Sequence, residues 1–380
     1  MKKILVFLTI LCTIFSIVFI ERTTVFASDI EVSAPNVYLC DINGENVIYS
    51  KAENERRPIA SMTKIMLLLL SFEANSEGNL DFEKQITVSS NASAMGGSQV
   101  FLQANKNYYV KDLIKSIIIA SANDASVAIA ETLYGSEEVA VAKMNEKAKS
   151  LGMNNTLFSN CTGLPKPTQF SSAKDVAIML TNLLKYDKYY EFSKIFLDEL
   201  VHPDGQKTVL TNTNKLVRFY EGCDGGKTGY TSEAGFCLAA TAKRDGMRII
   251  GVIINEKDSK TRFADCSKLF NYAFANYSSK NVLSKGEVYE LKAKVEKGEE
   301  NYVEIVPESD FSVVGKKNVN ENITVDFEPL KIIAPVKKGD YIGKFTIYKN
   351  NVKIAEVKAL ANQEVNKESI FDVMKNIAIY

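Results

Sequence analysis

The chain has 380 residues, of which 46% are hydrophobic and 24% charged, and this composition is typical of a folded globular protein. Its length allows a large core and a second module. The 46 basic and 46 acidic residues cancel. Without a basic excess, we exclude nucleic acid as a partner.

The N-terminus predicts export from the cytoplasm. Lys2 and Lys3 precede an apolar run over 4–20, and a small-residue cleavage site follows at 25–27. This order is typical of a secretory signal peptide over residues 1–27. The alternative is an uncleaved membrane anchor, because the run approaches the length of a membrane span. We expect a protein secreted to the outer face of the cytoplasmic membrane or the cell wall.

Cysteine and histidine counts exclude several kinds of site. Five cysteines follow the leader, widely spaced and without a C-x-x-C pair, so we expect buried thiols and no disulfide scaffold. His202 is the single histidine. We therefore expect no zinc site and no cofactor, and a Ser-His-Asp triad would have to use His202. Because a turn signature follows it at 203–205, a solvated loop histidine is the favoured interpretation.

In chain order, the elements alternate between hairpins and helices. Runs at 36–41 and 46–50 flank an Asn-Gly step, and runs at 236–242 and 248–254 flank Asp-Gly, so each pair predicts a β-hairpin. The segment 65–70 is apolar on every face, which predicts a buried helix. Further helices are expected over 111–133, 137–151, 172–187 and 261–277.

Alternating strands up to about Leu360 follow a polar stretch near residue 278. The sequence thus predicts an α+β domain over 28–278, with helices packed on an antiparallel sheet, and a small all-β domain over 279–362. A terminal amphipathic helix is expected over 363–380, with Ile370, Phe371, Val373, Met374 and Ile377 on one face. It would either bind the membrane surface or dock on the β-domain.

Three short motifs carry the predicted chemistry. Ser61 and Lys64 are three residues apart at the start of the buried helix, so the lysine amine can reach the serine hydroxyl. Serine needs a base, and a lysine can serve only when neutral, which requires its pKa to fall by about 3 units. Alone each motif is weak, since S-x-x-K recurs at 171–174 and S-x-N at 89–91.

The order of the motifs is more specific. Ser61-x-x-Lys64, Ser121-x-Asn123 and Lys227-Thr228-Gly229 form the motif set of β-lactamases and penicillin-binding proteins. Over residues 36–275 the chain resembles the low-molecular-mass penicillin-binding D-alanyl-D-alanine carboxypeptidases of the S11 type. The stretches that carry the resemblance are 57–64, 121–125, 154–156, 171–173 and 224–231. The segment that follows resembles their β-rich C-terminal module.

The resemblance implies a β-lactamase/transpeptidase-like fold and a serine carboxypeptidase that acts on peptidoglycan stem peptides and binds β-lactam antibiotics covalently. Ser61 would be the nucleophile and Lys64 its base. Ser121 would relay a proton to the leaving amine, and Asn123 would hold the peptide group. Lys227 and Thr228 would bind the substrate carboxylate, and Gly229 would let the backbone approach the substrate. Arg262 resembles a family arginine that helps to set the carboxylate end, and the backbone N–H groups of Ser61 and Tyr230 would form the oxyanion hole.

Three other functions share parts of this pattern. A class A β-lactamase needs a deacylating glutamate, and none occurs between Glu146 and Glu191. A D,D-endopeptidase or transpeptidase uses the same motifs and stays open. A catalytically silent wall-binding scaffold is disfavoured, because all the motif residues are intact. The second S-x-x-K, at 171–174, is interpreted as the start of a structural helix.

Overall fold

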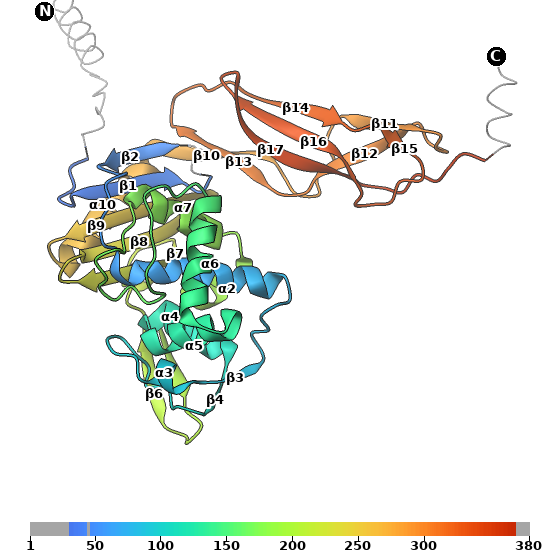
Figure 1. Cartoon of the computed structure of the whole chain (residues 1–380). Coiled ribbons are helices and arrows are strands. Elements are labelled where there is room, and N and C mark those ends of the chain that lie inside the picture. The colour runs from blue at the N-terminus through green and yellow to red at the C-terminus, as the bar shows by residue number, and fades with distance from the viewer. Residues whose placement is uncertain (1–29, 44–45, 370–380) are drawn as a thin grey trace, which may run out of the picture. The chain divides into compact units, whose positions relative to one another are not determined.

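The computed structural model describes residues 30–43 and 46–369. A five-stranded antiparallel sheet in the order β2-β1-β9-β8-β7 is the centre of the first domain (Figure 1). Its strands are β1 (Asn36–Asp41), β2 (Val47–Lys51), β7 (Cys223–Thr231), β8 (Gly235–Arg244) and β9 (Met247–Glu256). Both predicted hairpins are therefore confirmed. Strands far apart in the chain meet because β1 pairs with β9 along its whole length.

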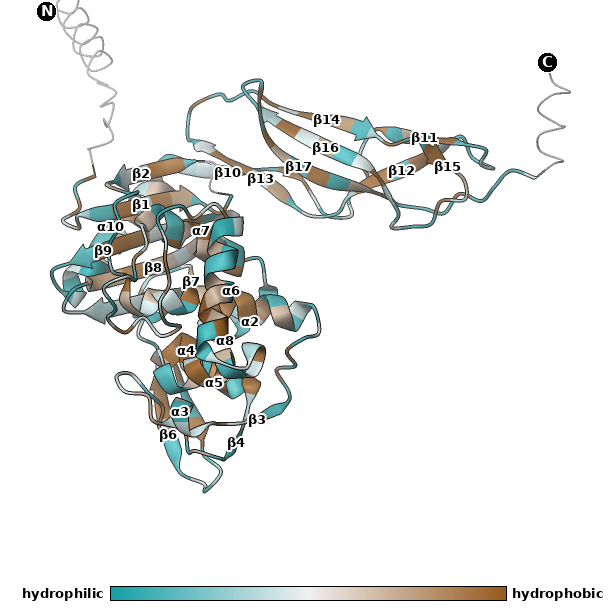
Figure 2. Cartoon of the chain, in the orientation of Figure 1, coloured by the Kyte–Doolittle hydropathy of each residue, from teal (hydrophilic) through white to brown (hydrophobic). Residues whose placement is uncertain are grey.

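Helices pack on both faces of this sheet. Alternate residues of a strand point to opposite faces. On β9, Ile250, Val252 and Ile254 join the core shared with the helical part, whereas a side chain at Gly251 would meet Phe270 of α10. Brown, apolar residues are visible on the strands and on the helices beside them (Figure 2). These observations confirm the α+β class, with an antiparallel sheet flanked by helices.

The helices lie close to their expected positions. The main ones are α2 (Lys64–Ser76), α4 (Val110–Ala120), α5 (Asn123–Tyr134), α6 (Glu137–Ser150), α7 (Ala173–Leu183), α8 (Asp187–Ser193) and α10 (Ser259–Asn276). Helix α2 is buried without interruption from Lys64 to Phe72, as its apolar sequence predicts. Smaller elements are the helix η1 (Ala60–Thr63), the helices α3 (Ser90–Ser93) and α9 (Leu216–Phe219), and the strands β3 (Gln85–Thr87), β4 (Asn107–Tyr109), β5 (Leu197–Val201) and β6 (Lys207–Thr211).

One predicted helix is two. The expected helix over 111–133 breaks between α4 and α5, where Ser121 adopts a left-handed conformation with φ of 64°. The backbone N–H of Ala122 then bonds back to the carbonyl of Ser116 at 3.2 Å. A left-handed residue ends a helix because the following turn cannot continue the i to i−4 pattern. The break creates a new helix start at Asn123, a residue of the second motif.

The interpretation of His202 as a solvated loop residue is wrong. Its side chain is buried, and its Nδ1 lies 2.8 Å from the hydroxyl of Tyr108 while its Nε2 lies 2.8 Å from that of Thr208. The turn at 203–205 is present, but the imidazole points inward, between Tyr108 of β4 and Thr208 of β6. A buried imidazole is stabilised when both ring nitrogens have partners. His202 is thus a structural residue.

The C-terminal domain is all-β, as predicted. Strand β10 (Tyr277–Leu283) pairs with β13 (Phe311–Lys316), and six further strands form a sheet in the order β14-β16-β17-β12-β11-β15. Their bounds are β11 (Lys292–Glu296), β12 (Tyr302–Pro307), β14 (Ile323–Pro329), β15 (Ile332–Ile333), β16 (Tyr341–Lys349) and β17 (Val352–Ala361). Alternate residues such as Ile305, Phe345 and Ile347 form its own core.

The expected terminal helix does not begin at residue 363. Residues 363–369 are extended and make two isolated bridges, Val336 with Val365 and Gly298 with Lys367. The Val365 side chain is buried in the β-domain core, and its burial holds this segment against the sheet. The apolar stripe from Ile370 to Ile377 lies outside the described residues, as does the predicted signal peptide over 1–27.

Two further observations concern the part of the chain that the structure describes. None of its helices has the length and apolarity needed to cross a membrane. The five cysteines Cys40, Cys161, Cys223, Cys237 and Cys266 are all buried and free. The prediction of buried thiols without a disulfide scaffold is confirmed for these five.

The aromatic cluster beneath α2 supplies a test of the core. The Phe72 ring is 1% exposed, with centroids 5.2 Å from Phe82 and 5.8 Å from Tyr189. We expect Phe72→Ala to lower the free energy of unfolding by about 3–5 kcal/mol, through lost burial and the cavity left behind. Phe219→Ala, at a ring that is 70% exposed, should cost less than about 1 kcal/mol. Urea denaturation measures both, and similar losses for the two variants would contradict this assignment of the core.

Candidate active site

Ser61 and Lys64 meet at the junction of η1 and α2. Ser61 belongs to the short helix η1, and Lys64 is the first residue of α2, one turn further on. Their spacing places the lysine Nζ 3.1 Å from the serine Oγ. The predicted contact between the two side chains is therefore present in the fold.

Lys64 is completely buried and fully hydrogen-bonded. Its Nζ lies 2.7 Å from Asn123 Oδ1 and also contacts the carbonyl oxygen of Thr162. Burial disfavours the charged ammonium and lowers the pKa of Lys64 to about 7, although Cys161 and Asp124 oppose this shift. The predicted role of Lys64 as a base requires an amine that is neutral near pH 7, and burial lowers the pKa far enough for this. A large fraction of Lys64 is thus able to accept a proton from Ser61.

The break between α4 and α5 positions the middle motif. Ser121 is buried at the end of α4, and its Oγ has no hydrogen-bond partner within the described residues. Asn123 begins α5, and its amide Nδ2 donates to the carbonyl of Gly96 at 2.7 Å while its Oδ1 faces Lys64. The left-handed φ of Ser121 ends α4, so that Ser121 and Asn123 flank the break and Asn123 starts a new helix.

Asp124 holds the loop that faces this motif. Its buried carboxylate accepts hydrogen bonds from the backbone N–H groups of Val100 and Leu102, and the N–H of Asn123 bonds to the carbonyl of Ser98 at 2.7 Å. Asp124 thus connects α5 to the segment over 96–102 and fixes where Asn123 points. No local sequence pattern marks Asp124 as a functional residue, because its contacts are to backbone groups, which are the same for every residue type.

The third motif lies on the edge strand β7. Lys227 is 1% exposed, and in the described structure its Nζ bonds to the carbonyl of Thr228 at 3.1 Å. Burial and the nearby charges of Lys64 and Arg262 lower its pKa well below the usual range. The charge of a carboxylate bound here would be screened little by water, and it would favour the ammonium form of Lys227. The position suits a carboxylate ligand.

Two glycines allow β7 and a loop to approach the nucleophile closely. A Cβ at Gly229 would lie 2.6 Å from the carbonyl oxygen of Ile59 and 3.3 Å from the backbone N of Ser61. A Cβ at Gly163 would lie 2.0 Å from the carbonyl oxygen of Ala60, which itself has φ of 46°. A side chain at Gly229 would push η1 away from β7, and a side chain at Gly163 would push η1 away from the loop that carries Gly163. The sequence predicts Gly229 as a place where backbone approaches the substrate; its close approach to η1, and the role of Gly163, come from the structure.

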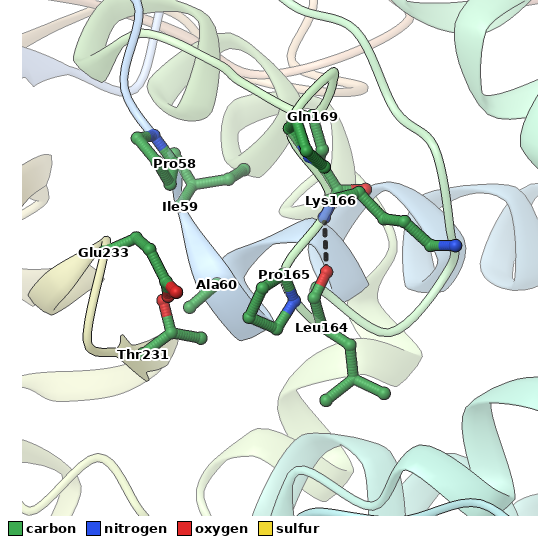
Figure 3. A pocket seen from close by; sticks show the side chains of 11 residues that line it. Pro58, Ile59, Ala60, Leu164, Pro165, Lys166, Gln169, Thr231 and Glu233 are labelled. Atoms are coloured by element: carbon green, nitrogen blue, oxygen red, sulfur yellow. Dashed lines mark hydrogen bonds between the residues drawn. The ribbon is translucent and has the colours of Figure 1, made fainter.

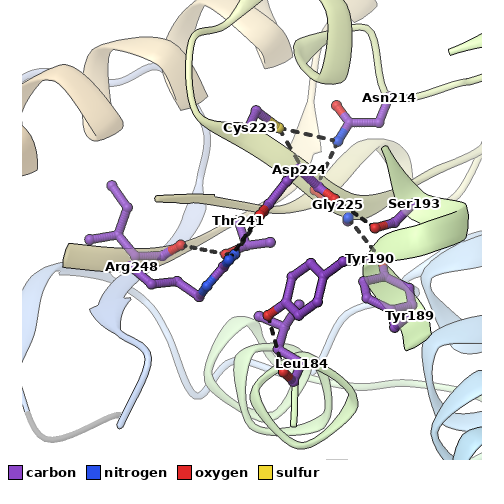
Figure 4. A network of polar contacts seen from close by, with 12 residues as sticks. Leu184, Tyr189, Tyr190, Ser193, Asn214, Cys223, Asp224, Gly225, Thr241 and Arg248 are labelled. Atoms are coloured by element: carbon purple, nitrogen blue, oxygen red, sulfur yellow. Dashed lines mark hydrogen bonds and ion pairs between the residues drawn. The ribbon is translucent and has the colours of Figure 1, made fainter. Parts of the chain in front are cut away.

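Buried polar contacts fix the start of β7 from behind (Figure 4). Asp224 receives two hydrogen bonds from Arg248, at 2.7 and 2.8 Å, in a bidentate ion pair. The N–H of Gly226 donates to the hydroxyl of buried Tyr189 at 3.0 Å, and Ser193 donates to the carbonyl of Asp224. Together these contacts hold the strand rigidly beside η1, directly before Lys227. They come from distant parts of the sequence and were not foreseen.

Arg262 and Tyr230 complete the surroundings. Arg262, on α10, donates to the carbonyl oxygens of Gly229 and Cys237 at 3.3 and 3.0 Å, and burial lowers its pKa to about 10. Its cation therefore supports the two strands next to Lys227. Tyr230 is 57% exposed, with its ring against Phe236 at a centroid distance of 4.3 Å.

The repeated motifs serve as helix caps. In the second S-x-x-K, Ser172 accepts a hydrogen bond from the N–H of Asp175 and caps α7, while Lys174 is exposed. In the second S-x-N, Ser89 likewise caps α3 by accepting from Ala92 at 2.9 Å. A serine that accepts from the N–H three residues on is a common N-cap. Neither repeat contributes to the site around Ser61.

Comparisons with known proteins agree with this geometry. The family model for D-alanyl-D-alanine carboxypeptidases (Peptidase_S11) matches residues 22–258, and that for the C-terminal domain of penicillin-binding protein 5 matches 277–367. The chain is 39% identical over 350 residues to the D-alanyl-D-alanine carboxypeptidase DacF of Bacillus subtilis, covering 92% of this chain and 90% of the relative.

More distant relatives give the same result. The D-alanyl-D-alanine carboxypeptidase DacC of Escherichia coli is 30% identical, covering 93% of this chain and 90% of the relative. The crystal structure of a peptidoglycan synthesis regulatory factor (PBP3) from Streptococcus pneumoniae has a TM-score of 0.73 at 25% identity. That match covers 88% of this chain and all of the other.

The fold and the motif residues are those of a penicillin-binding serine hydrolase. The chain belongs to the D-alanyl-D-alanine carboxypeptidase family. Its catalytic domain of sheet and helices, followed by an all-β domain, is the arrangement that these family models describe.

Proposed function

We propose that this protein removes the terminal D-alanine from peptidoglycan stem pentapeptides through an acyl-enzyme on Ser61. One observation carries the proposal: the Nζ of Lys64 lies 3.1 Å from the Ser61 Oγ in a fully buried position that lowers the lysine pKa to about 7. Such an amine is a general base at neutral pH. Histidine is not available for this task, since buried His202 bonds to Tyr108 and Thr208.

The acyl transfer follows from these positions. Neutral Lys64 takes the Ser61 proton as the Oγ attacks the carbonyl carbon of the penultimate D-alanine. The N–H groups of Ser61 and Tyr230 stabilise the oxyanion, an interaction that contributes about 3–4 kcal/mol per donor in such sites. The amide bond then breaks, and the proton that Lys64 took passes through the Ser121 hydroxyl to the nitrogen of the departing D-alanine, which returns Lys64 to its neutral form. Water hydrolyses the remaining ester and regenerates Ser61.

Substrate orientation depends on the groups around Lys227. The terminal carboxylate would bind the buried Lys227 cation and the hydroxyl of Thr228, with Arg262 supporting the strand that carries them. Asn123 would hold the peptide group on the other side of Ser61. A β-lactam presents both a carboxylate and an acyl carbonyl at similar positions, so the same groups would direct its attack by Ser61.

We also propose the domain bounds of the protein, its location and its attachment to the membrane. We assign residues 1–27 to a cleaved signal peptide, 28–278 to the catalytic domain and 279–362 to the β-domain. The protein would act outside the cytoplasmic membrane, where its polymer substrate lies. Residues 370–380 would bind the membrane surface through their apolar stripe, and the β-domain would separate the catalytic domain from the lipid.

Covalent labelling tests the nucleophile. Fluorescent penicillin should label the mature protein on the peptide that contains Ser61, and Ser61→Ala should abolish the label because it removes the hydroxyl that bonds to Lys64. Thermal unfolding of the variant should change by little, since a nucleophile contributes little to the core. Mass spectrometry of the labelled peptide decides the position. An adduct on Ser171 would refute the choice between the two S-x-x-K motifs.

The pH dependence of acylation tests the base. Only the neutral form of Lys64 accepts the serine proton, so the acylation rate constant should rise as the pH passes through about 7 and level off above it. Below that pKa the rate should fall about tenfold per pH unit, since the ammonium form is inactive. Stopped-flow measurements with benzylpenicillin between about pH 5 and 9 give this profile. A flat profile would exclude Lys64 as the base.

The carboxylate site is tested by Lys227→Met, which keeps the packing and removes the cation. Acylation by penicillin and turnover of a D-Ala-D-Ala peptide should both fall on the order of 100-fold, because both ligands present an anion there. An ester substrate without the terminal carboxylate serves as the control, and its kcat/KM should fall far less. Equal losses on all substrates would mean that Lys227 acts on Lys64 instead.

Membrane attachment is tested by truncation. Removing 370–380 keeps Val365 in the β-domain core, so stability should be retained. Fractionation should then find the enzyme released from membranes, with its activity on soluble peptide intact. Five apolar side chains bury only part of their surface at an interface, so attachment should be reversible. A truncated protein that stays bound would point to an uncleaved 4–20 segment, which N-terminal sequencing reveals.

A further inference from the structure

A groove of about 220 Å³ adjoins η1 beside the end of β7 (Figure 3). Its floor is formed by Pro58, Ile59 and Ala60, the residues that directly precede Ser61. Leu164 and Pro165 form one wall, and the turn between β7 and β8 forms the other. The lining next to Ser61 is therefore mostly aliphatic.

The direction of β7 places this groove relative to a bound peptide. The strand runs from Lys227 past Gly229, which lies against Ile59 and Ser61, to Thr231 at the edge of the groove. A peptide whose carboxylate meets Lys227 and whose scissile carbonyl meets Ser61 continues toward Thr231 with its preceding residues. The residue before the D-Ala-D-Ala pair would thus lie at the groove.

Glu233 provides the one acidic group of the groove lining. Its carboxylate lies across the groove from Leu164 and Pro165 in Figure 3, and among the described residues it takes part in no ion pair or hydrogen bond. Lys166 also belongs to the lining, but Figure 3 shows its ammonium turned away from Glu233. An aliphatic trough with an available carboxylate at its side complements an alkyl chain that ends in an ammonium group.

We propose, building on the function above, that this groove binds the side chain of the residue before D-Ala-D-Ala and that Glu233 pairs with its free terminal ammonium. A cross-linked stem peptide has that amine acylated and uncharged, so it lacks the ion pair. Glu233 would therefore favour stem peptides whose own side-chain amine is free over stem peptides that have accepted a cross-link through that amine.

Two matched peptides test this preference. Nα-acetyl-L-Lys-D-Ala-D-Ala keeps the free ε-ammonium, whereas Nα,Nε-diacetyl-L-Lys-D-Ala-D-Ala presents a neutral amide at the same place. The ratio of kcat/KM for the free peptide to that for the acetylated peptide is measured by released D-alanine. We expect the wild-type enzyme to favour the free peptide on the order of 5-fold, since a partly exposed ion pair contributes modestly.

Glu233→Gln should bring this ratio close to one, because the amide keeps the shape and removes the charge. Glu191→Gln, at an exposed carboxylate on α8, is the matched control and should keep the wild-type ratio. The ratio is internal to each variant, so partial misfolding does not alter it. Penicillin labelling reports separately whether Ser61 is active.

Two results would overturn the inference while leaving the proposed function intact: equal turnover of both peptides by the wild-type enzyme, or a preference that survives in Glu233→Gln. An enzyme that labels with penicillin but cleaves neither peptide would overturn the proposed carboxypeptidase function, and this inference with it.

Discussion

The burial of the Lys64 amine is the constraint on which the rest of the site depends. Burial lowers the pKa of Lys64 to about 7. The buried amine is stabilised by Ser61, Asn123 and the Thr162 carbonyl, which surround its nitrogen. To hold it there, α2 is buried along most of its length, and the loop with Thr162 closes over the helix start. The catalytic base and the stability of the helical core are therefore consequences of one packing arrangement.

A second buried lysine, Lys227, belongs to the site, and the protein supports it differently. Lys227 depends on the rigidity of β7, which Tyr189, Arg248 and Arg262 support from three separate elements. Burial, and after it repulsion from Lys64 and Arg262, lowers the pKa of Lys227 well below its usual range. That same concentration of positive potential suits a substrate with a terminal carboxylate. Binding the anion relieves a cost that the free enzyme bears.

Specificity beyond the two D-alanines depends on a different kind of surface. The groove beside η1 is lined mainly by aliphatic side chains and is open, so burial there is partial and each contact is weak. The charge on Glu233 therefore discriminates by a small factor, whereas the buried lysines Lys64 and Lys227 decide whether the reaction occurs at all. Substitutions at surface residues of the groove can therefore change the preference for the upstream residue without changing the reacting centre.

The sequence by itself determined the motif order, both hairpins of the central sheet, the buried helix α2 and the all-β second domain. These features depend on local periodicity and turn residues, which act over a few positions. Only the tertiary structure decided that the helix over 111–133 breaks at Ser121, and that His202 is buried between Tyr108 and Thr208. It also revealed Gly163, Asp124, Tyr189 and the Asp224–Arg248 pair as supports of the site. Their partners are backbone groups or side chains distant in sequence, and such contacts leave no local pattern because they exist only once the chain has folded.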